Sequence, residues 1–138
     1  IPSVGTSGGI VPIWKSTAIS VMVLEENRQF LQLRCFIPGM PDFLLTSVYA
    51  LPHSDLRSEL WQKLKIISSG ISLPWVVWGD FNDILSNTER VGGAQCNMRR
   101  VNWFQRQVHD CDLIDLGASS PKFTWKGPRL RGCRRLFE

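Results

Sequence analysis

The stretch Pro74-Trp75-Val76-Val77-Trp78-Gly79-Asp80-Phe81-Asn82-Asp83 passes from apolar to polar side chains within a few residues. Its first half is apolar throughout instead of alternating, which predicts a strand covered on both faces in the middle of a sheet. The polar half follows directly, so its side chains are expected at the carboxyl end of that strand. Ligands of open α/β sheets bind at such strand ends. The stretch therefore predicts a sheet and a site at its edge.

Further strands are expected on both sides of this stretch. Runs rich in β-branched and aromatic residues are separated by turn residues at 25–28 and 38–41. The predicted strands lie at residues 9–14, 18–24, 30–37, 43–50, 74–79, 113–116 and 122–125.

Two helices are predicted from apolar residues that recur at spacings of three and four. The first covers residues 54–70 with Ser54 as its cap, and the second covers 98–112 with Asn97 as its cap. Strands interleaved with two helices predict an α/β (α+β) sandwich.

The composition is that of an ordinary globular domain. The chain has 138 residues, 43% hydrophobic and 20% charged, which excludes disordered, collagen-like and low-complexity proteins. No run reaches the ~18 consecutive apolar residues of a membrane helix, so no membrane partner is expected. We predict one domain over residues 1–138. Because the chain starts at Ile1 and stops at Glu138 directly after a basic cluster, we expect this domain to be a fragment.

Positive charge is concentrated in the last third of the chain. The net charge is +4, yet residues 1–89 hold 6 Lys and Arg against 8 Asp and Glu, whereas residues 90–138 hold 10 against 4. This distribution suits a polyanionic partner such as nucleic acid, with solvated arginines as the alternative. Arg129 and Arg131 could lie along a DNA backbone, or in a solvated loop.

Cysteine and tryptophan positions predict burial more than chemistry. The four cysteines are too widely spaced for a Cys-x-x-Cys motif, so we expect free thiols, with Cys35 and Cys111 buried. Surface positions are expected for Trp14 and Trp125. Four tryptophans that fall within apolar elements are predicted to lie in the core: Trp61, Trp75, Trp78 and Trp103.

Asp80 and Asn82 are the sharpest candidates for chemistry. They lie two residues apart, so in an extended backbone both side chains leave on the same side. A carboxylate that orients or deprotonates water, beside an amide that donates to a phosphoryl oxygen, suits phosphodiester hydrolysis. The alternative is an Asx turn in which both side chains bond their own backbone.

Three blocks carry a family resemblance that covers nearly the whole chain: residues 73–85, 90–93 and 113–125. With the strand end Ser47-Val48-Tyr49-Ala50, they resemble the endonuclease/exonuclease/phosphatase superfamily. The closer resemblance is to the endonuclease domain of plant LINE-type (non-LTR) retrotransposons. The resemblance implies a four-layered sandwich of two mixed β-sheets flanked by helices, here incomplete.

The resemblance also implies roles for individual residues. It makes Asp80 the residue that aligns or activates the attacking water, Asn82 a holder of the scissile phosphate, and Tyr49 a donor to the same phosphate. Thr124 and Trp125 match a block on the DNA side of the site. The implied cofactor is Mg²⁺ or Mn²⁺, the partner is DNA, and the cellular place is the nucleus. Such a cation keeps several waters, so few protein carboxylates are needed.

The sequence departs from the family pattern in ways that put activity in doubt. The family's metal-binding Glu would lie upstream of Gly8-Gly9, and its Ser-Asp-His block would lie beyond Glu138. His53 and His109 lie outside the required context, so both are expected at the surface. Losing one member of a catalytic unit costs roughly 10⁴ to 10⁶ in rate. We therefore expect negligible nuclease activity from this polypeptide alone.

The sequence is also compatible with two other functions. A phosphatase of the same superfamily, acting on phosphoinositides or small phosphate esters, would share Asp80 and Asn82 but would lack a long basic groove. A non-catalytic relic or nucleic-acid-binding module would keep the sheet without the chemistry.

Overall fold

The computed structural model describes residues 9–92, 96–117, 119 and 123. The chain divides into two compact units, Ile1–Asn82 and Asp83–Glu138. The first unit contains a four-stranded sheet and one helix, and the second contains a short 3₁₀ turn and another helix. The described fold is thus α/β, as the sequence predicts.

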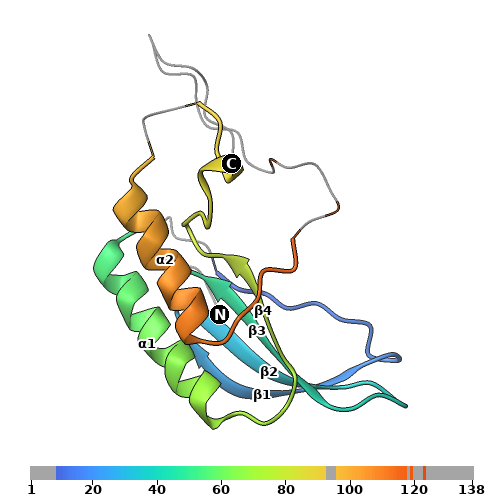
Figure 1. The fold of residues 1–138 in the computed structure, drawn as a ribbon. Coiled ribbons are helices and arrows are strands. Elements are labelled where there is room, and N and C mark those ends of the chain that lie inside the picture. The colour runs from blue at the N-terminus through green and yellow to red at the C-terminus, as the bar shows by residue number, and fades with distance from the viewer. Residues whose placement is uncertain (1–8, 93–95, 118, 120–122, 124–138) are drawn as a thin grey trace. The chain divides into compact units, whose positions relative to one another are not determined.

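The sheet of the first unit is mixed (Figure 1). Its strand order is β1-β2-β3-β4, with β1–β2 and β2–β3 antiparallel and β3–β4 parallel. A turn with Pro38 at its second position and Gly39 (φ 81°) at its third leads from β2 to β3, the arrangement of a type II turn. The strands are β1 (Ser20–Asn27), β2 (Phe30–Phe36), β3 (Phe43–Tyr49) and β4 (Trp75–Asp80).

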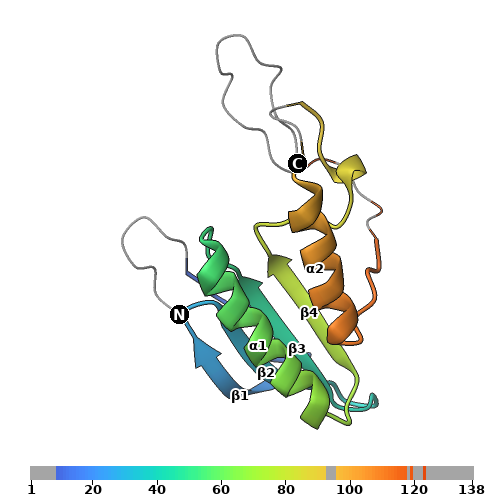
Figure 2. The ribbon, with the colours of Figure 1, turned by 60° about the vertical axis from the view of Figure 1, so that its left-hand side comes forward.

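Helix α1 (Ser54–Gly70) joins the parallel strands β3 and β4 and lies along one face of the sheet (Figure 2). Its buried side chains include Leu60, Trp61 and Leu64, which recur at helical spacing. From the sheet, Phe30 and Thr46 are also fully buried. This α1-covered face holds the largest buried side chains of the unit.

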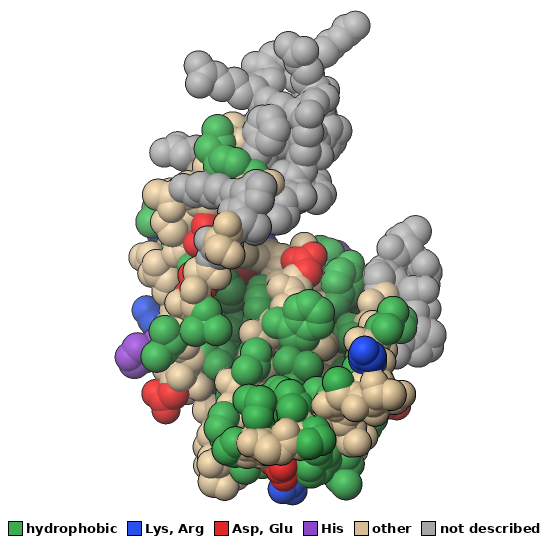
Figure 3. Space-filling model, turned by 90° about the vertical axis from the view of Figure 1, so that its right-hand side faces the viewer, with side chains coloured by type: hydrophobic (Ala, Val, Ile, Leu, Met, Phe, Trp, Pro, Cys, Tyr) green, Lys and Arg blue, Asp and Glu red, His purple; other side chains and the backbone are tan. Residues whose placement is uncertain are grey.

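The opposite face of the sheet, which we call the open face, is buried only in part. Leu31, Leu33 and Cys35 are buried there beside Ile10. Trp78 is 58% exposed and Val76 41% exposed on the edge strand β4. Figure 3 shows hydrophobic side chains gathered on this side of the molecule.

The second unit is built around helix α2 (Met98–Asp110), which Asn97 caps by accepting a hydrogen bond from Arg99 N at 3.1 Å. Side chains of the helix hold the preceding loop. Arg100 pairs with the buried carboxylate of Asp83, and Gln105 Nε2 donates to Leu85 O at 2.7 Å. The 3₁₀ turn η1 (Asn87–Glu89) lies in this loop. None of the helices in the described ranges is long and apolar enough to cross a membrane.

Several sequence-based predictions about strands are wrong. Residues 9–14 and 113–116 form no strand, and the first strand runs over Ser20–Asn27 instead of 18–24. Among the described residues, β4 pairs only with β3 and is an edge strand, although its sequence predicts a central one. The reason is that an apolar run reports which side chains would tolerate burial, and not whether a neighbouring strand is present.

Some predictions about individual side chains are confirmed and others are wrong. Trp61 is buried as expected, whereas Trp78 is largely exposed and does not belong to the core. Helix α1 begins after His53, with no side-chain cap from Ser54. Cys35, Cys96 and Cys111 are free thiols, with the first and third buried, and His109 is exposed as predicted. Trp75 and Trp103 are half-buried, and Trp125 and residues 122–125, apart from Phe123, lie outside the described part.

Candidate functional site

Tyr49 and Asp80 lie side by side at the ends of two parallel strands. They are register partners at the last positions of β3 and β4. The geometry follows from the β3–α1–β4 connection, because a helical crossover returns the chain parallel to the first strand and brings both carboxyl ends to one edge. We call Tyr49, Asp80 and Asn82 the rim site.

Gly79 allows the two strand ends to approach closely. Its φ is 135°, a value that side chains of L-residues rarely adopt. A Cβ placed on it would lie 2.0 Å from Val48 O on the neighbouring strand. The glycine before Asp80 is therefore a structural requirement of this strand end.

Asp80 and Asn82 form the Asx turn that the sequence left open as an alternative. Asp80 Oδ1 accepts a hydrogen bond from Asn82 N at 2.8 Å, and Asn82 has a left-handed backbone (φ 49°). Asn82 Nδ2 donates to Ala50 O at 2.6 Å, while Ala50 N donates to Asp80 O at 2.7 Å. These bonds tie the end of β4 to the end of β3.

Phe81 anchors the same turn in the core. Its ring stacks on Trp61 of α1, with 5.5 Å between centroids and 20° between planes. Each of residues 79–82 thus has a structural role. In chain order, they allow the close approach of the strands, form the turn, anchor it in the core and bond the end of β4 to the end of β3. Every residue of the Gly-Asp-Phe-Asn motif has a purpose in the fold, whatever its chemistry.

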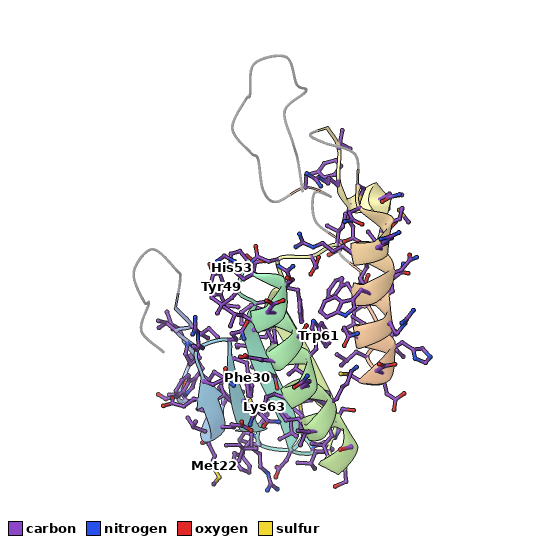
Figure 4. All side chains as sticks on the ribbon, turned by 90° about the vertical axis from the view of Figure 1, so that its left-hand side faces the viewer. Met22, Phe30, Tyr49, His53, Trp61 and Lys63 are labelled. Carbon is purple, nitrogen blue, oxygen red and sulfur yellow. The ribbon has the colours of Figure 1, made fainter. Side chains whose placement is uncertain are left out.

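Gln29 supports the rim site from the buried side, which the sequence did not signal. Its side chain donates to Leu56 O at 2.8 Å and accepts from Leu51 N at 3.0 Å. Its backbone oxygen accepts from Tyr49 N at 2.8 Å. Gln29 links β2, the end of β3 and the start of α1, where Figure 4 shows Tyr49 and His53 at the same end of the unit. A glutamine in a turn carries no pattern that predicts such a link.

The turn leaves part of the rim site open to solvent. The Asp80 side chain is exposed, and its Oδ2 accepts no hydrogen bond from the described residues. Tyr49 is half-buried and packs against the buried cluster of the open face, and its hydroxyl has no hydrogen-bond partner among the described residues. A carboxylate oxygen and a phenol hydroxyl are therefore available at one sheet edge. Asn82 Nδ2, in contrast, already donates one bond to a backbone carbonyl.

The described residues do not form a metal site by themselves. No group of three or more His, Cys, Asp or Glu within them is placed to hold an ion. At the rim site they supply one exposed carboxylate, Asp80. Mg²⁺ sites commonly combine one or two carboxylates with waters and substrate phosphates, so Asp80 alone is at most a part of one.

The structure brings together the three predicted catalytic residues, Tyr49, Asp80 and Asn82. The predicted DNA contacts lie outside the described residues: Thr124, Trp125, Arg129 and Arg131.

The rim geometry is that of an α/β protein with a polar site at the carboxyl ends of parallel strands. Comparison with protein-family models and with curated proteins gives no match for this sequence.

The rim site offers two kinds of chemistry. An exposed carboxylate can orient a water or accept its proton, and a phenol hydroxyl can donate to an oxyanion. Both groups come from strand ends held by backbone hydrogen bonds, so their relative position is fixed by the sheet. This arrangement suits hydrolysis of an ester whose charged oxygens lie against the sheet edge.

Proposed function

We propose that the chain is part of a metal-dependent DNA endonuclease domain of the LINE-retrotransposon type, within the endonuclease/exonuclease/phosphatase superfamily. One observation carries the proposal: Tyr49 and Asp80 are paired in register at adjacent parallel strand ends, with the Asp80 side chain exposed. The family resemblance assigns Asp80 to the attacking water and Tyr49 to the scissile phosphate.

In this proposal Asp80 Oδ2 orients the attacking water and accepts its proton. The Tyr49 hydroxyl donates to a non-bridging phosphate oxygen as negative charge develops there. Asn82 holds the Asp80 carboxylate and the Ala50 carbonyl in place, and phosphate binding through its amide is a smaller part of its task. The activity requires Mg²⁺ or Mn²⁺ with ligands beyond the described residues, and the site of action is nuclear DNA.

We extend the proposal to the architecture of a four-layered sandwich of two sheets. The open face supports it, because Trp78 and Val76 leave apolar surface in contact with water. A second sheet packed about 10 Å away would bury such a face. In this arrangement the rim site would lie at one end of both sheets.

The proposal is tested first by mapping where a phosphodiester binds. In ¹H–¹⁵N NMR titrations with a short DNA duplex and Mg²⁺, we expect shifts at Tyr49, Ala50 and residues 79–82, weakened by Asp80→Asn. Asp112→Asn is the matched control, because Asp112 is also exposed and has a left-handed backbone (φ 52°) that Asn tolerates. Duplex binding that leaves the amides of the rim site unshifted contradicts the proposal.

A plasmid-nicking assay with Mg²⁺ or Mn²⁺ tests the chemistry itself. For this chain we expect a rate near the uncatalysed one, because at the rim site the described residues supply one exposed carboxylate, Asp80. Any nicking observed should be lost in Asp80→Asn and kept in Asp112→Asn. Nicking that Asp80→Asn leaves unchanged contradicts the assigned roles.

The alternatives make different predictions in the same experiments. A superfamily phosphatase should bind inositol polyphosphates at the rim site more tightly than it binds duplex DNA. A non-catalytic module finds support in the Asx turn, which gives Asp80 and Asn82 structural tasks. It should bind DNA with a steep salt dependence, unchanged by Asp80→Asn, and show no turnover.

A further inference from the structure

Helix α2 presents a polar face that the rim site does not use. Its buried side chains are Val101, Phe104 and Gln107. The opposite face carries four exposed side chains at spacings of three, four and three residues, which places them on one side of the helix. We call this set the α2 stripe: Arg99, Asn102, Arg106 and His109.

The two arginines of the stripe have no ion-pair partner within the described residues. Arg99 and Arg106 are both exposed, and neither forms a salt bridge there. Arg100, one position along the helix, is instead paired with the buried carboxylate of Asp83 and holds the preceding loop. The arginines of this helix thus have different roles: Arg100 stabilises the preceding loop, whereas Arg99 and Arg106 face solvent.

Arg99 also has no evident value for helix stability. It lies in the first turn of α2, where positive charge opposes the helix dipole and costs about 0.3–1 kcal/mol. The acidic residues Asp110 and Asp112 lie at and just beyond the other end of the helix. A solvent-facing cation that opposes the helix dipole, with no ion-pair partner in the described part of the chain, is better explained by a binding partner than by the fold.

The spacing of the stripe allows both arginines to contact one nucleic-acid backbone. Arg99 and Arg106 are seven residues apart, about 10.5 Å along a helix axis. Phosphates of one DNA strand rise about 3.4 Å per nucleotide along the duplex axis and also wind around it, so they lie farther apart than this rise, and two long arginine side chains can each reach a different phosphate. The Asn102 amide lies between the two arginines and can donate to an intervening phosphate, a common backbone contact.

We propose that the α2 stripe binds the phosphate backbone of duplex DNA, with Arg99 and Arg106 each on a phosphate and Asn102 between them. The inference rests on the proposed function in taking DNA as the partner, and it adds a contact surface in the second unit. Backbone contacts of this kind carry no sequence preference and release counterions, so binding falls steeply with salt.

The test compares two charge-matched variants by fluorescence anisotropy with a labelled 20-base-pair duplex. Arg99→Gln/Arg106→Gln should weaken binding about tenfold or more at 0.1 M salt and reduce the slope of log K against log salt by about 2. The control, Lys15→Gln/Arg28→Gln, removes two exposed cations of the first unit and should stay within about twofold of the parent. Circular dichroism melting of both variants verifies that they remain folded.

The outcomes separate this inference from the proposed function. Equal weakening by both double variants overturns the inference, because net charge alone would then explain binding. Absence of duplex binding by the parent chain overturns the inference together with the choice of DNA as partner. Loss of binding to phosphatidylserine vesicles in Arg99→Gln/Arg106→Gln, with duplex binding intact, overturns it in favour of a membrane surface. Asp80→Asn should weaken the amide shifts of the rim site but should keep the loss of affinity and of salt slope caused by Arg99→Gln/Arg106→Gln, so failure at the rim site leaves the stripe result standing.

Discussion

The two faces of the sheet carry similar side chains that differ in burial. On β4, Trp75 belongs to the α1-covered face and donates to Thr46 Oγ1 at 2.8 Å, and Trp78 belongs to the open face and donates to Ser47 Oγ at 2.7 Å. Both indoles find a hydroxyl on β3, yet Trp78 remains 58% exposed. An indole can therefore form its hydrogen bond without being buried. The α1-covered face is buried because helix α1 packs on it, whereas no described helix of the first unit packs on the open face.

The rim site lies where these two faces meet. Phe81 reaches into the α1-covered face against Trp61, whereas Tyr49 packs with the cluster of the open face. The site thus takes its rigidity from one face and its accessibility from the other.

Tryptophan truncation on the two faces should show the largest contrast. Trp61→Ala removes a fully buried ring and its stacking partner for Phe81, so we expect a loss of about 3–5 kcal/mol in the free energy of unfolding. Trp78→Ala should cost less than about 1.5 kcal/mol, chiefly the hydrogen bond to Ser47. Urea denaturation measures both, and equal losses would show that the open face is as tightly packed as the other.

Glycine substitution tests how closely the ends of β3 and β4 approach each other. Gly79→Ala places a Cβ 2.0 Å from Val48 O, with φ in a strained region, so we expect at least about 3 kcal/mol of destabilisation. The control is Gly39→Ala, also at positive φ but in open space, which should cost about 1–2 kcal/mol. Thermal melting of the two variants gives the difference, and a Gly79→Ala variant as stable as Gly39→Ala would contradict the close approach of β3 and β4.

Two substitutions of Asn82 separate its backbone from its side chain. Asn82→Gly keeps the left-handed conformation but loses the bond to Ala50 O, an expected cost of about 1 kcal/mol. Asn82→Ala loses the bond and adds strain, so about 2–3 kcal/mol is expected. Urea unfolding of both variants tests the ranking. Identical stabilities would mean that the bond, and not the turn conformation, holds the strand ends.

The smallest expected effect concerns Cys35 on the open face. Burial raises the pKa of its thiol, because the thiolate is disfavoured away from water. The unfolded thiol, with a pKa near 8.5, then loses its proton first, so the free energy of unfolding falls as the pH rises above about 8.5. The measurement is stability from pH 7 to 10 against Cys35→Ala, which should show a shallower decline. The same pH dependence of stability in both proteins would indicate that Cys35 is in contact with solvent and would contradict its burial on the open face.

Much of the site was predictable because its residues are neighbours in sequence. The change from apolar to polar at 74–83 predicts a strand that ends in a polar turn, and Asp80 and Asn82 do form that turn. The pairing of Tyr49 with Asp80 needed more, because 30 residues and a helix separate them and only the parallel crossover brings them together. The Gln29 link and the Phe81–Trp61 stack carry no local pattern at all.

The sequence by itself determined local structure. It predicted the turn at Pro38-Gly39, the two amphipathic helices, Asn97 as the cap of α2, and the polar strand end at Asp80. These depend on backbone conformation and hydrophobic spacing within a few residues. Only the tertiary structure decided that β4 is an edge of the described sheet and that Trp78 faces solvent. Burial depends on which distant elements pack against a surface. An apolar side chain tolerates burial, but its presence in the sequence does not ensure that another element covers it.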